Sequence, residues 1–178
     1  MTDSELDWHL IKSKETAREL QGFTCTTDHP RTPRGRRLPH PRPWEWEAQR
    51  HLRSADRHLR HGDDLLVGRV GSGALGAAAH VVYDDDSSLL VANIQALGVG
   101  LSLRQQGGVT ADEAFAVIRR FAELEADVRR CTTLVLAGKV HRQNLASQYA
   151  CLRAGLEPVS GSVADYQTWA LRIDKDPA

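Results

Sequence analysis

The segment from Val140 to Val159 constrains the fold most, because it has the pattern of a short helix between two definite end signals. The run 132–137 before it is apolar, partly β-branched and of strand length, and Gly138 ends it. Asn144 is a good N-cap, since its side chain accepts hydrogen bonds from the free N–H groups of the first turn. Gly155 stands where a left-handed C-cap is expected. The sequence therefore predicts a unit of strand, capped short helix, glycine and strand.

The rest of the chain alternates helix and strand patterns. Thr110 and Glu113 have the spacing of a capping box at the start of a helix. Gly98 and Gly100 interrupt a β-prone run, and glycines inside a strand mark a bulge, a splay or the close approach of a ligand. The predicted elements outside the first unit are a helix over 3–20, a strand over 23–27, a helix over 44–61, strands over 65–70, 74–83 and 89–103, a helix over 110–128, and a last strand over 166–173.

Length and composition predict one domain over residues 1–178. The 23 basic and 23 acidic residues give no net charge, so the whole molecule does not indicate a nucleic-acid or membrane partner. No apolar run approaches the roughly 20 residues that span a bilayer, and the first residues lack the apolar segment of a signal peptide, which predicts a cytoplasmic protein. Cys25, Cys131 and Cys151 are widely spaced without a CxxC pair, so neither a disulfide framework nor a metal site is expected.

Asn144, Ser147, Gly155 and Leu156 follow one another at a spacing that resembles the final third of the GNAT superfamily of acyl-CoA-dependent N-acyltransferases. The order of elements from Phe23 onward is similar to that superfamily as well. The resemblance implies an α/β (α+β) fold with a mixed, mostly antiparallel central sheet of six to seven strands flanked by helices. It also implies acetyl-CoA as the co-substrate. An ordinary capped helix between strands is the alternative interpretation of the same residues.

The junction from Leu101 to Glu113 is the second feature that suggests chemistry. A glycine-containing turn before a helix presents unpaired N–H groups, which together with the helix dipole suit a pyrophosphate, although a plain turn has the same pattern. By resemblance this place binds the pyrophosphate of CoA, in a register that starts at either Arg104 or Gln105. The sixth position, normally small, is then Val109 or Thr110. The cofactor-binding residues implied are Leu101, Leu103, Arg104, Gln105, Gly107, Gly108, Val109, Thr110 and Asn144.

Acetyl transfer to an amine needs a base for the amine proton and an acid for the leaving thiolate. GNAT members often carry a tyrosine seven residues after the asparagine, but that position here is Cys151, which is either a buried spacer or a sign that the thiolate leaves unaided. They often carry a glutamate on the strand before the phosphate loop, where this chain has none. His80 is the ionisable alternative on the preceding strand, and a lone strand histidine is also commonly structural.

Arginine is frequent over 31–60, and the loop over 28–43 is rich in proline and arginine, so it is either an exposed, mobile arm or a long ordered loop. Trp44 and Trp46 beside these arginines suit RNA, although the tryptophans equally suit packing onto the sheet. The favoured function is transfer of an acetyl group from acetyl-CoA to a primary amine by direct attack in a ternary complex. The alternatives are a GNAT-type module that binds CoA or a protein without catalysis, and acetylation of an aminoacyl-tRNA amine. A homodimer is compatible with each.

Overall fold

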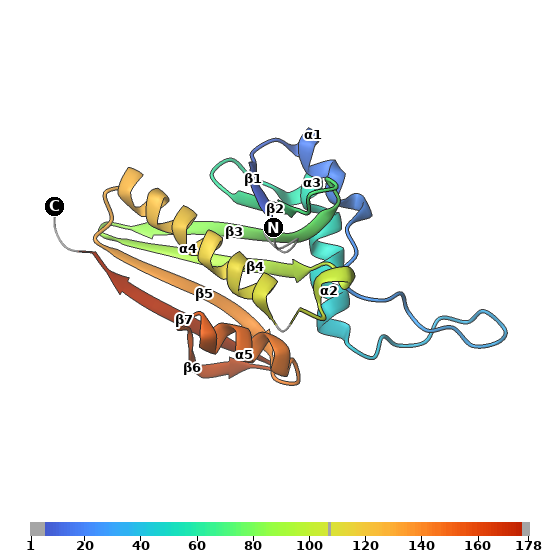
Figure 1. Cartoon of the computed structure of the whole chain (residues 1–178). Coiled ribbons are helices and arrows are strands. Elements are labelled where there is room, and N and C mark those ends of the chain that lie inside the picture. The colour runs from blue at the N-terminus through green and yellow to red at the C-terminus, as the bar shows by residue number, and fades with distance from the viewer. Residues whose placement is uncertain (1–5, 107, 176–178) are drawn as a thin grey trace.

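The computed structural model describes residues 6–106 and 108–175, without the side chains of 160–163. Its seven-stranded sheet has the order β1-β2-β3-β4-β5-β7-β6 (Figure 1). Neighbouring strands are antiparallel except β4 and β5, which are parallel. The predicted mixed, mostly antiparallel sheet flanked by helices is confirmed. The strands are β1 (Asp7–Ile11), β2 (Asp64–Arg69), β3 (Leu75–Asp86), β4 (Leu89–Val99), β5 (Thr133–His141), β6 (Glu157–Val163) and β7 (Tyr166–Asp174).

Helices cover both faces of the sheet (Figure 1). One face carries α4 (Val109–Val128) and α5 (Leu145–Arg153). The other carries the short elements α1 (Lys14–Ala17), η1 (Arg18–Gly22, a 3₁₀ helix), α2 (Pro43–Arg53) and α3 (Ala55–His58). A second 3₁₀ helix, η2 (Leu101–Leu103), follows β4. Among the described residues, no helix combines the length and apolarity needed to cross a membrane.

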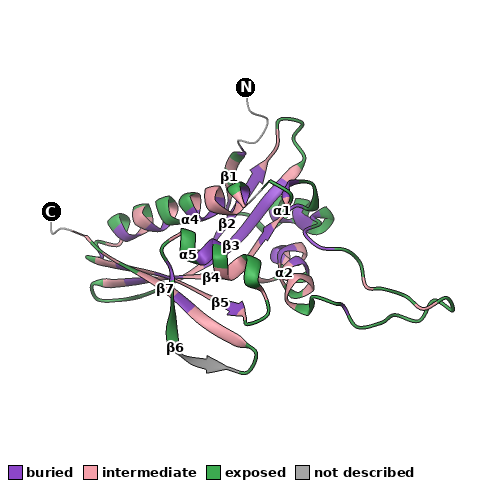
Figure 2. Ribbon diagram, turned by 60° about the horizontal axis from the view of Figure 1, so that its bottom comes forward, coloured by how far each residue is buried: buried purple, intermediate pink, exposed green. Residues whose placement is uncertain are grey.

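The central strands are buried on both faces, because adjacent residues of a strand point to opposite sides of the sheet (Figure 2). Leu65 and Val67 of β2 pack with α2 and η1, whereas Leu66 between them packs with α4. Ala78 and Ala79 of β3 divide in the same way. The sheet therefore separates two apolar cores.

The pairing of β4 with β5 stops halfway along the two strands. Their parallel register runs from Leu89 beside Thr133 to Ile94 beside Gly138 and no further, although β4 continues to Val99. At the same point the pairing of β3 with β4 shifts by one residue, which leaves Gln95 as an extra residue on β4. Such a bulge bends its strand and increases the local twist. The two strands therefore part beyond Ile94.

The N-terminal segment differs from its predicted helix over 3–20. Asp7–Ile11 forms β1 and pairs with β2, so helical structure is limited to the residues after Lys14. The predicted strand over 23–27 is also wrong: Cys25 and Thr26 each donate a backbone N–H to the Gln49 side chain at 2.7 and 3.0 Å. Pairing with distant residues outweighs local pattern in both places.

The two glycines near the end of β4 provide close packing. A Cβ on Gly98 would lie 2.8 Å from the Phe23 ring and 3.0 Å from Leu52, and one on Gly100 would lie 3.0 Å from the carbonyl oxygen of Gly76. Gly98 therefore allows α2 and the Phe23 segment to approach the sheet. The bulge in β4, one of the alternatives for these glycines, lies at Gln95 and not at either of them.

The proline- and arginine-rich segment 28–42 extends away from the sheet as a long loop (Figure 1). Its tip closes through a bridge between Arg31 and Arg37 and through the N–H of Gly35, which donates to the carbonyl of Thr32. The base of the loop is held by His40, which is buried and whose ring nitrogens lie 2.9 Å from the carbonyl oxygens of Thr27 and Arg42. The loop is thus anchored at its base and exposed at its tip.

Replacing Gln49 by methionine tests the anchor of the segment at Cys25. Methionine has a similar volume but cannot accept the two buried N–H bonds, so the Gln49→Met variant is expected to lose about 2 kcal/mol of unfolding free energy. Urea denaturation followed by circular dichroism measures this loss. Gln143→Met, at an exposed position, is the matched control and should unfold like the wild type. Equal unfolding free energies for Gln49→Met and Gln143→Met would contradict the stabilising role of the Gln49 side chain.

Candidate functional site

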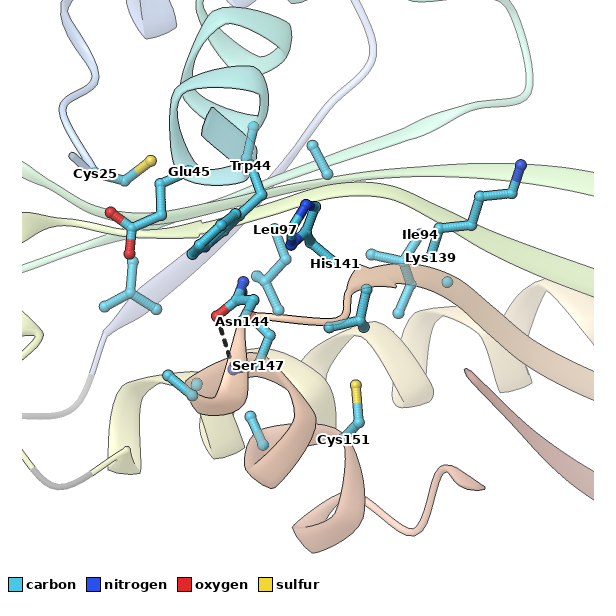
Figure 3. Close-up of a pocket in the computed structure, with 18 of the residues that line it drawn as sticks. Cys25, Trp44, Glu45, Ile94, Leu97, Lys139, His141, Asn144, Ser147 and Cys151 are labelled. Carbon is cyan, nitrogen blue, oxygen red and sulfur yellow. Dashed lines mark hydrogen bonds between the residues drawn. The ribbon is translucent and has the colours of Figure 1, made fainter. Parts of the chain in front are cut away.

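A cavity of about 1010 Å³ opens where β4 and β5 part. Residues from β4, the end of β5, α5 and the start of α4 form one side of it, and α2 forms the opposite side (Figure 3). Ile94 and Leu97 of β4 belong to the apolar wall, together with Val140 of β5 and Phe115 of α4. The lining therefore comes from helices on both sides of the sheet, so one cavity offers two different sets of side chains to a ligand.

The unit predicted around Asn144 is confirmed and lies in the cavity wall. Asn144 caps α5: its side-chain oxygen accepts from the Ser147 N–H at 3.2 Å, and its side-chain nitrogen donates to the Ser147 hydroxyl at 2.7 Å (Figure 3). Gly155 ends the helix with a φ of 82° in the left-handed region. Asn144 and Ser147 both line the cavity. The motif therefore positions α5 beside the parted strands.

The N-terminus of α4 differs from the predicted capping box. The helix begins at Val109 after Gly108, which is left-handed with a φ of 91° and leaves the first turn without a side-chain cap. Glu113 accepts instead from the Leu6 N–H at 3.1 Å and from the Trp8 indole at 2.9 Å. Thr110 is buried and its hydroxyl has no partner among the described residues. An uncapped helix start with an unpaired hydroxyl suits an anion.

Arg153 of α5 adds a positive charge at this helix start. A Cβ on Gly108 would lie 2.5 Å from Nη2 of Arg153, so the guanidinium would have to shift, and the φ of 91° at this position independently favours glycine. Arg153 is held by Asp112, with Nε 2.9 Å from both carboxylate oxygens and Nη2 2.8 Å from one of them. Arg153 lies more than 40 residues after Gly108 in the sequence. It therefore adds a basic group to the turn before α4 that the sequence of the turn does not contain.

The structure brings five of the predicted cofactor-binding residues to the cavity: Leu103, Arg104, Gly108, Thr110 and Asn144. Leu101, Gln105 and Val109 are exposed and do not line it, and Gly107 lies outside the described residues.

The predicted strand over 89–103 is too long, because it ends at Val99 and Leu101 and Leu103 lie in η2. The Leu101 N–H donates to the carbonyl of Thr24, and the Leu103 N–H to that of Gly100, so neither pairs with a ligand as a strand residue would. The edge of β4 that faces β5 loses its strand partner before these residues, at the bulged residue Gln95. The positions of β4 that have no strand partner on the side of β5 are therefore Gln95 to Val99.

Arg104 reaches the cavity already paired. Its Nη1 lies 2.8 Å from Oε1 of Glu45, whose other oxygen accepts from the Thr26 hydroxyl at 2.7 Å. Burial raises the pKa of Glu45, but the hydrogen bonds from Thr26 and Arg104 outweigh it and hold that pKa below its usual value. This pair therefore remains ionised and joins α2 to the turn after β4.

His80 does not line the cavity. It is buried, with Nε2 3.2 Å from the carboxylate of Asp63 and Nδ1 2.8 Å from Nε2 of His51. His51 of α2 does line the cavity, so any contact between His80 and the cavity passes through His51. Burial, together with His58 and His80, lowers the pKa of His51 to about 4, which leaves its ring neutral at neutral pH.

Cys151 lines the cavity as a buried thiol (Figure 3). Burial alone raises its pKa to about 11, so the reactive thiolate is disfavoured. This environment agrees with a buried spacer rather than a nucleophile.

Four side chains connect α2 to the end of β5 and the start of β7. The sequence did not predict that they would meet. Trp44 stacks on His141 with ring centroids 4.4 Å apart, and Tyr166 meets His141 edge-on at 5.1 Å. The Tyr166 hydroxyl donates to the carboxylate of Glu47. Burial and Glu47 raise the pKa of Tyr166 to about 12, so the hydroxyl keeps its proton. No local pattern joins these residues, which lie on three separate elements.

Trp46 is also packed within the protein. Its ring contacts His29 at 4.6 Å and His40 at 5.9 Å, and the Arg37 guanidinium lies 5.3 Å from its centroid. Trp44, stacked on His141 of β5, therefore packs onto the sheet as one interpretation expects, whereas Trp46 packs on the loop over 28–42.

The thiol of Cys151 should resist alkylation in the folded protein. A pKa of about 11 puts the thiolate fraction at neutral pH about 100-fold below that of an ordinary thiol. Iodoacetamide labelling with peptide mass spectrometry should therefore modify Cys151 slowly in buffer and readily in urea. Labelling in buffer as fast as that of free cysteine would instead identify a reactive thiol.

Comparison with known proteins identifies the fold by structure alone. No family model matches the sequence, and no curated protein matches it. Among solved structures, the chain is similar to a variant of the spermidine N-acetyltransferase of Vibrio cholerae, with 11% identity, a TM-score of 0.55 and coverage of 95% of this chain and 94% of that one.

Two further structures have the same architecture. AtaTR bound with AcCoA has 11% identity, a TM-score of 0.54 and coverage of 93% of both chains. An IAA acetyltransferase from Bacillus cereus has 10% identity, a TM-score of 0.51 and coverage of 94% of this chain and 99% of that one. The chain therefore has the fold of the GNAT acetyltransferases.

Proposed function

We propose that this protein is an N-acetyltransferase that transfers the acetyl group of acetyl-CoA to a primary amine by direct attack in a ternary complex. The observation that carries the proposal is the cavity where strands β4 and β5 part, which is lined by residues from both sides of the sheet. A solved structure with the same fold is bound with AcCoA, which supports the same co-substrate here.

The α4 side of the cavity suits the cofactor. The uncapped first turn of α4, the unpaired Thr110 hydroxyl and the Arg153 guanidinium together form a site for the pyrophosphate. Beyond Ile94 the edge of β4 that faces β5 has no strand partner, so its backbone groups are free to pair with the amides of the pantetheine arm. Asn144, fixed by Ser147, lines the same cleft from the start of α5.

The α2 side suits the acceptor. Trp44, Glu47 and His141 line the cavity there, and Tyr166 joins them through its hydrogen bond to Glu47. In the proposed reaction the amine nitrogen forms a bond to the thioester carbon and gives up one proton to water in the cleft, the carbon–sulfur bond breaks, and the thiolate takes a proton from the protein. Of the two tyrosines that line the cavity, Tyr149 is 61% exposed, whereas Tyr166 is half-buried with a protonated hydroxyl. We assign the role of proton donor to Tyr166. GNAT members often have a tyrosine for this role at the position that is Cys151 here.

Two alternatives make different predictions. A module that binds CoA without catalysis would bind acetyl-CoA but release no CoA with any amine. An enzyme for aminoacyl-tRNA would bind RNA in a salt-sensitive way through the arginines of 31–60, and would lose that binding when Arg50, Arg53 and Arg57 are neutralised.

Acetyl-CoA binding tests the cofactor site directly. Calorimetry should give saturable heat, and Thr110→Val should weaken binding about ten-fold, because it removes one hydrogen bond to a charged group. The buried hydroxyl has no partner in the protein, so the variant should fold at least as stably as the wild type. Thr132→Val, at an exposed position outside the cavity, is the matched control. Absence of heat with the wild type at high acetyl-CoA concentration would overturn the proposal.

Release of CoA thiol with a panel of primary amines measures catalysis. Tyr166→Phe is expected to lower kcat about 100-fold and to leave the Kd of acetyl-CoA unchanged, as removal of a general acid does. Tyr149→Phe should leave both quantities unchanged, since that side chain is exposed. A Tyr166→Phe variant with full kcat would remove this residue from the mechanism.

A further inference from the structure

Three histidines from separate elements meet beside the cavity on the α2 side. His51 belongs to α2, His58 ends α3 and His80 lies on β3. One nitrogen of each ring lies within 4.8 Å of the corresponding nitrogens of the other two. The ring centroids are 4.2 Å apart for His51 and His58, 5.1 Å for His51 and His80, and 5.5 Å for His58 and His80. In sequence these residues lie too far apart to suggest a site.

The hydrogen bonds around the cluster orient lone pairs into it. The Asp63 carboxylate accepts from the Arg60 N–H at 2.9 Å and lies 3.2 Å from Nε2 of His80. A carboxylate can only accept, so Nε2 of His80 carries the proton and Nδ1 presents its lone pair to His51. Nε2 of His58 is buried and has no hydrogen-bond partner among the described residues. A buried, unpaired ring nitrogen beside two other imidazoles lacks the ligand that would satisfy it.

We propose that His51, His58 and His80 bind a divalent transition-metal ion, with Zn²⁺ as the natural occupant. Three ligand nitrogens around a tetrahedral zinc ion at 2.0–2.1 Å would lie about 3.3 Å apart. The present separations, from 2.8 Å between His51 and His80 up to 4.8 Å, bracket that value, so the rings need to move by only about an ångström. Binding replaces the hydrogen bond between His51 and His80, and the proton of His51 moves to its other ring nitrogen.

The charges around the cluster favour a cation. The Asp63 side chain is 6% exposed, and its only ion-pair partner among the described residues is His80. A buried carboxylate without a permanent cation is costly, and a metal ion behind the imidazole offsets that cost. An acceptor carboxylate on a ligating histidine is also the usual outer shell of a zinc site.

The fourth coordination position of the proposed ion faces the cavity. His51, His58 and Ser54 line the cavity, whereas His80 lies behind them. Three protein ligands with an open position are typical of zinc sites that bind water or a substrate atom. This inference goes beyond the proposed acetyl transfer, because the acetyl-CoA side of the cleft contributes no ligand to the ion.

Metal titration of the full chain, freed of metal by a chelator and with any affinity tag removed, tests the site without acetyl-CoA. Zn²⁺ calorimetry should give one ion per chain, and Co²⁺ should give the intense visible absorption of a tetrahedral nitrogen site. His58→Ala is expected to weaken Zn²⁺ binding at least 100-fold, and Asp63→Asn, which changes only the outer shell, about 10- to 100-fold. Bound Zn²⁺ should also raise the melting temperature of the wild type.

His61→Ala is the matched control, since His61 is exposed, close in sequence and outside the cluster. It should bind Zn²⁺ and Co²⁺ like the wild type. The inference is overturned if the metal-free wild type takes up no Zn²⁺, or if His58→Ala and wild type bind it equally. Either result would leave hydrogen bonding alone, from Nε2 of His80 to Asp63, as the explanation of the cluster. Failure here would leave calorimetry with acetyl-CoA unaffected, so the two proposals are tested separately.

Discussion

The structure depends on the place where two parallel strands stop exchanging hydrogen bonds. Up to Ile94 and Gly138, β4 and β5 form an ordinary parallel pair inside a sheet whose two faces are both covered. One extra residue, Gln95, then turns β4 away, while β5 stays paired with β7 as far as His141. Backbone groups left inside a protein without partners are costly, so a ligand that pairs with them gains free energy that a complete sheet would have used internally. The cavity and its two walls, which come from both sides of the sheet, follow from this interruption.

The two walls are fixed by different means. On the α4 side, local signals suffice: Asn144 caps α5, Gly155 ends it, and Gly108 lets Arg153 approach the start of α4. On the α2 side, long-range contacts do the work. Gly98 admits Phe23 and Leu52, Gln49 holds the chain at Cys25, and Glu45 pairs with Arg104.

This division explains what the sequence could predict. The strand–helix–glycine unit at 140–159, the order of the later elements and the mixed sheet were predictable, because caps, glycines and apolar runs are local. Gly108, Thr110 and Asn144, which the resemblance implied for the cofactor, lie in the cavity wall. The strand at Asp7–Ile11 was taken for a helix because only its partner β2 makes it a strand. His51 and His58, the bridge from Trp44 to Tyr166, and Arg153 were missed because each acquires its role from a residue at least 20 positions away. The position of the bulge at Gln95 was not predictable, because nothing in Gln95 itself marks it.

Helix α2 presents Trp44, Glu47 and His51 along one stripe to the cavity, while Gln49 and Leu52 on another face hold it to the core. The residues proposed for the cofactor belong to a later part of the chain, from Gln95 onward. Substitutions along the cavity stripe of α2 therefore change the side chains that a second ligand would meet, while the residues that attach the helix and those of the cofactor wall stay the same. For the proposed acetyl transfer, one eleven-residue helix can thus vary in its acceptor contacts without a change in the proposed cofactor site.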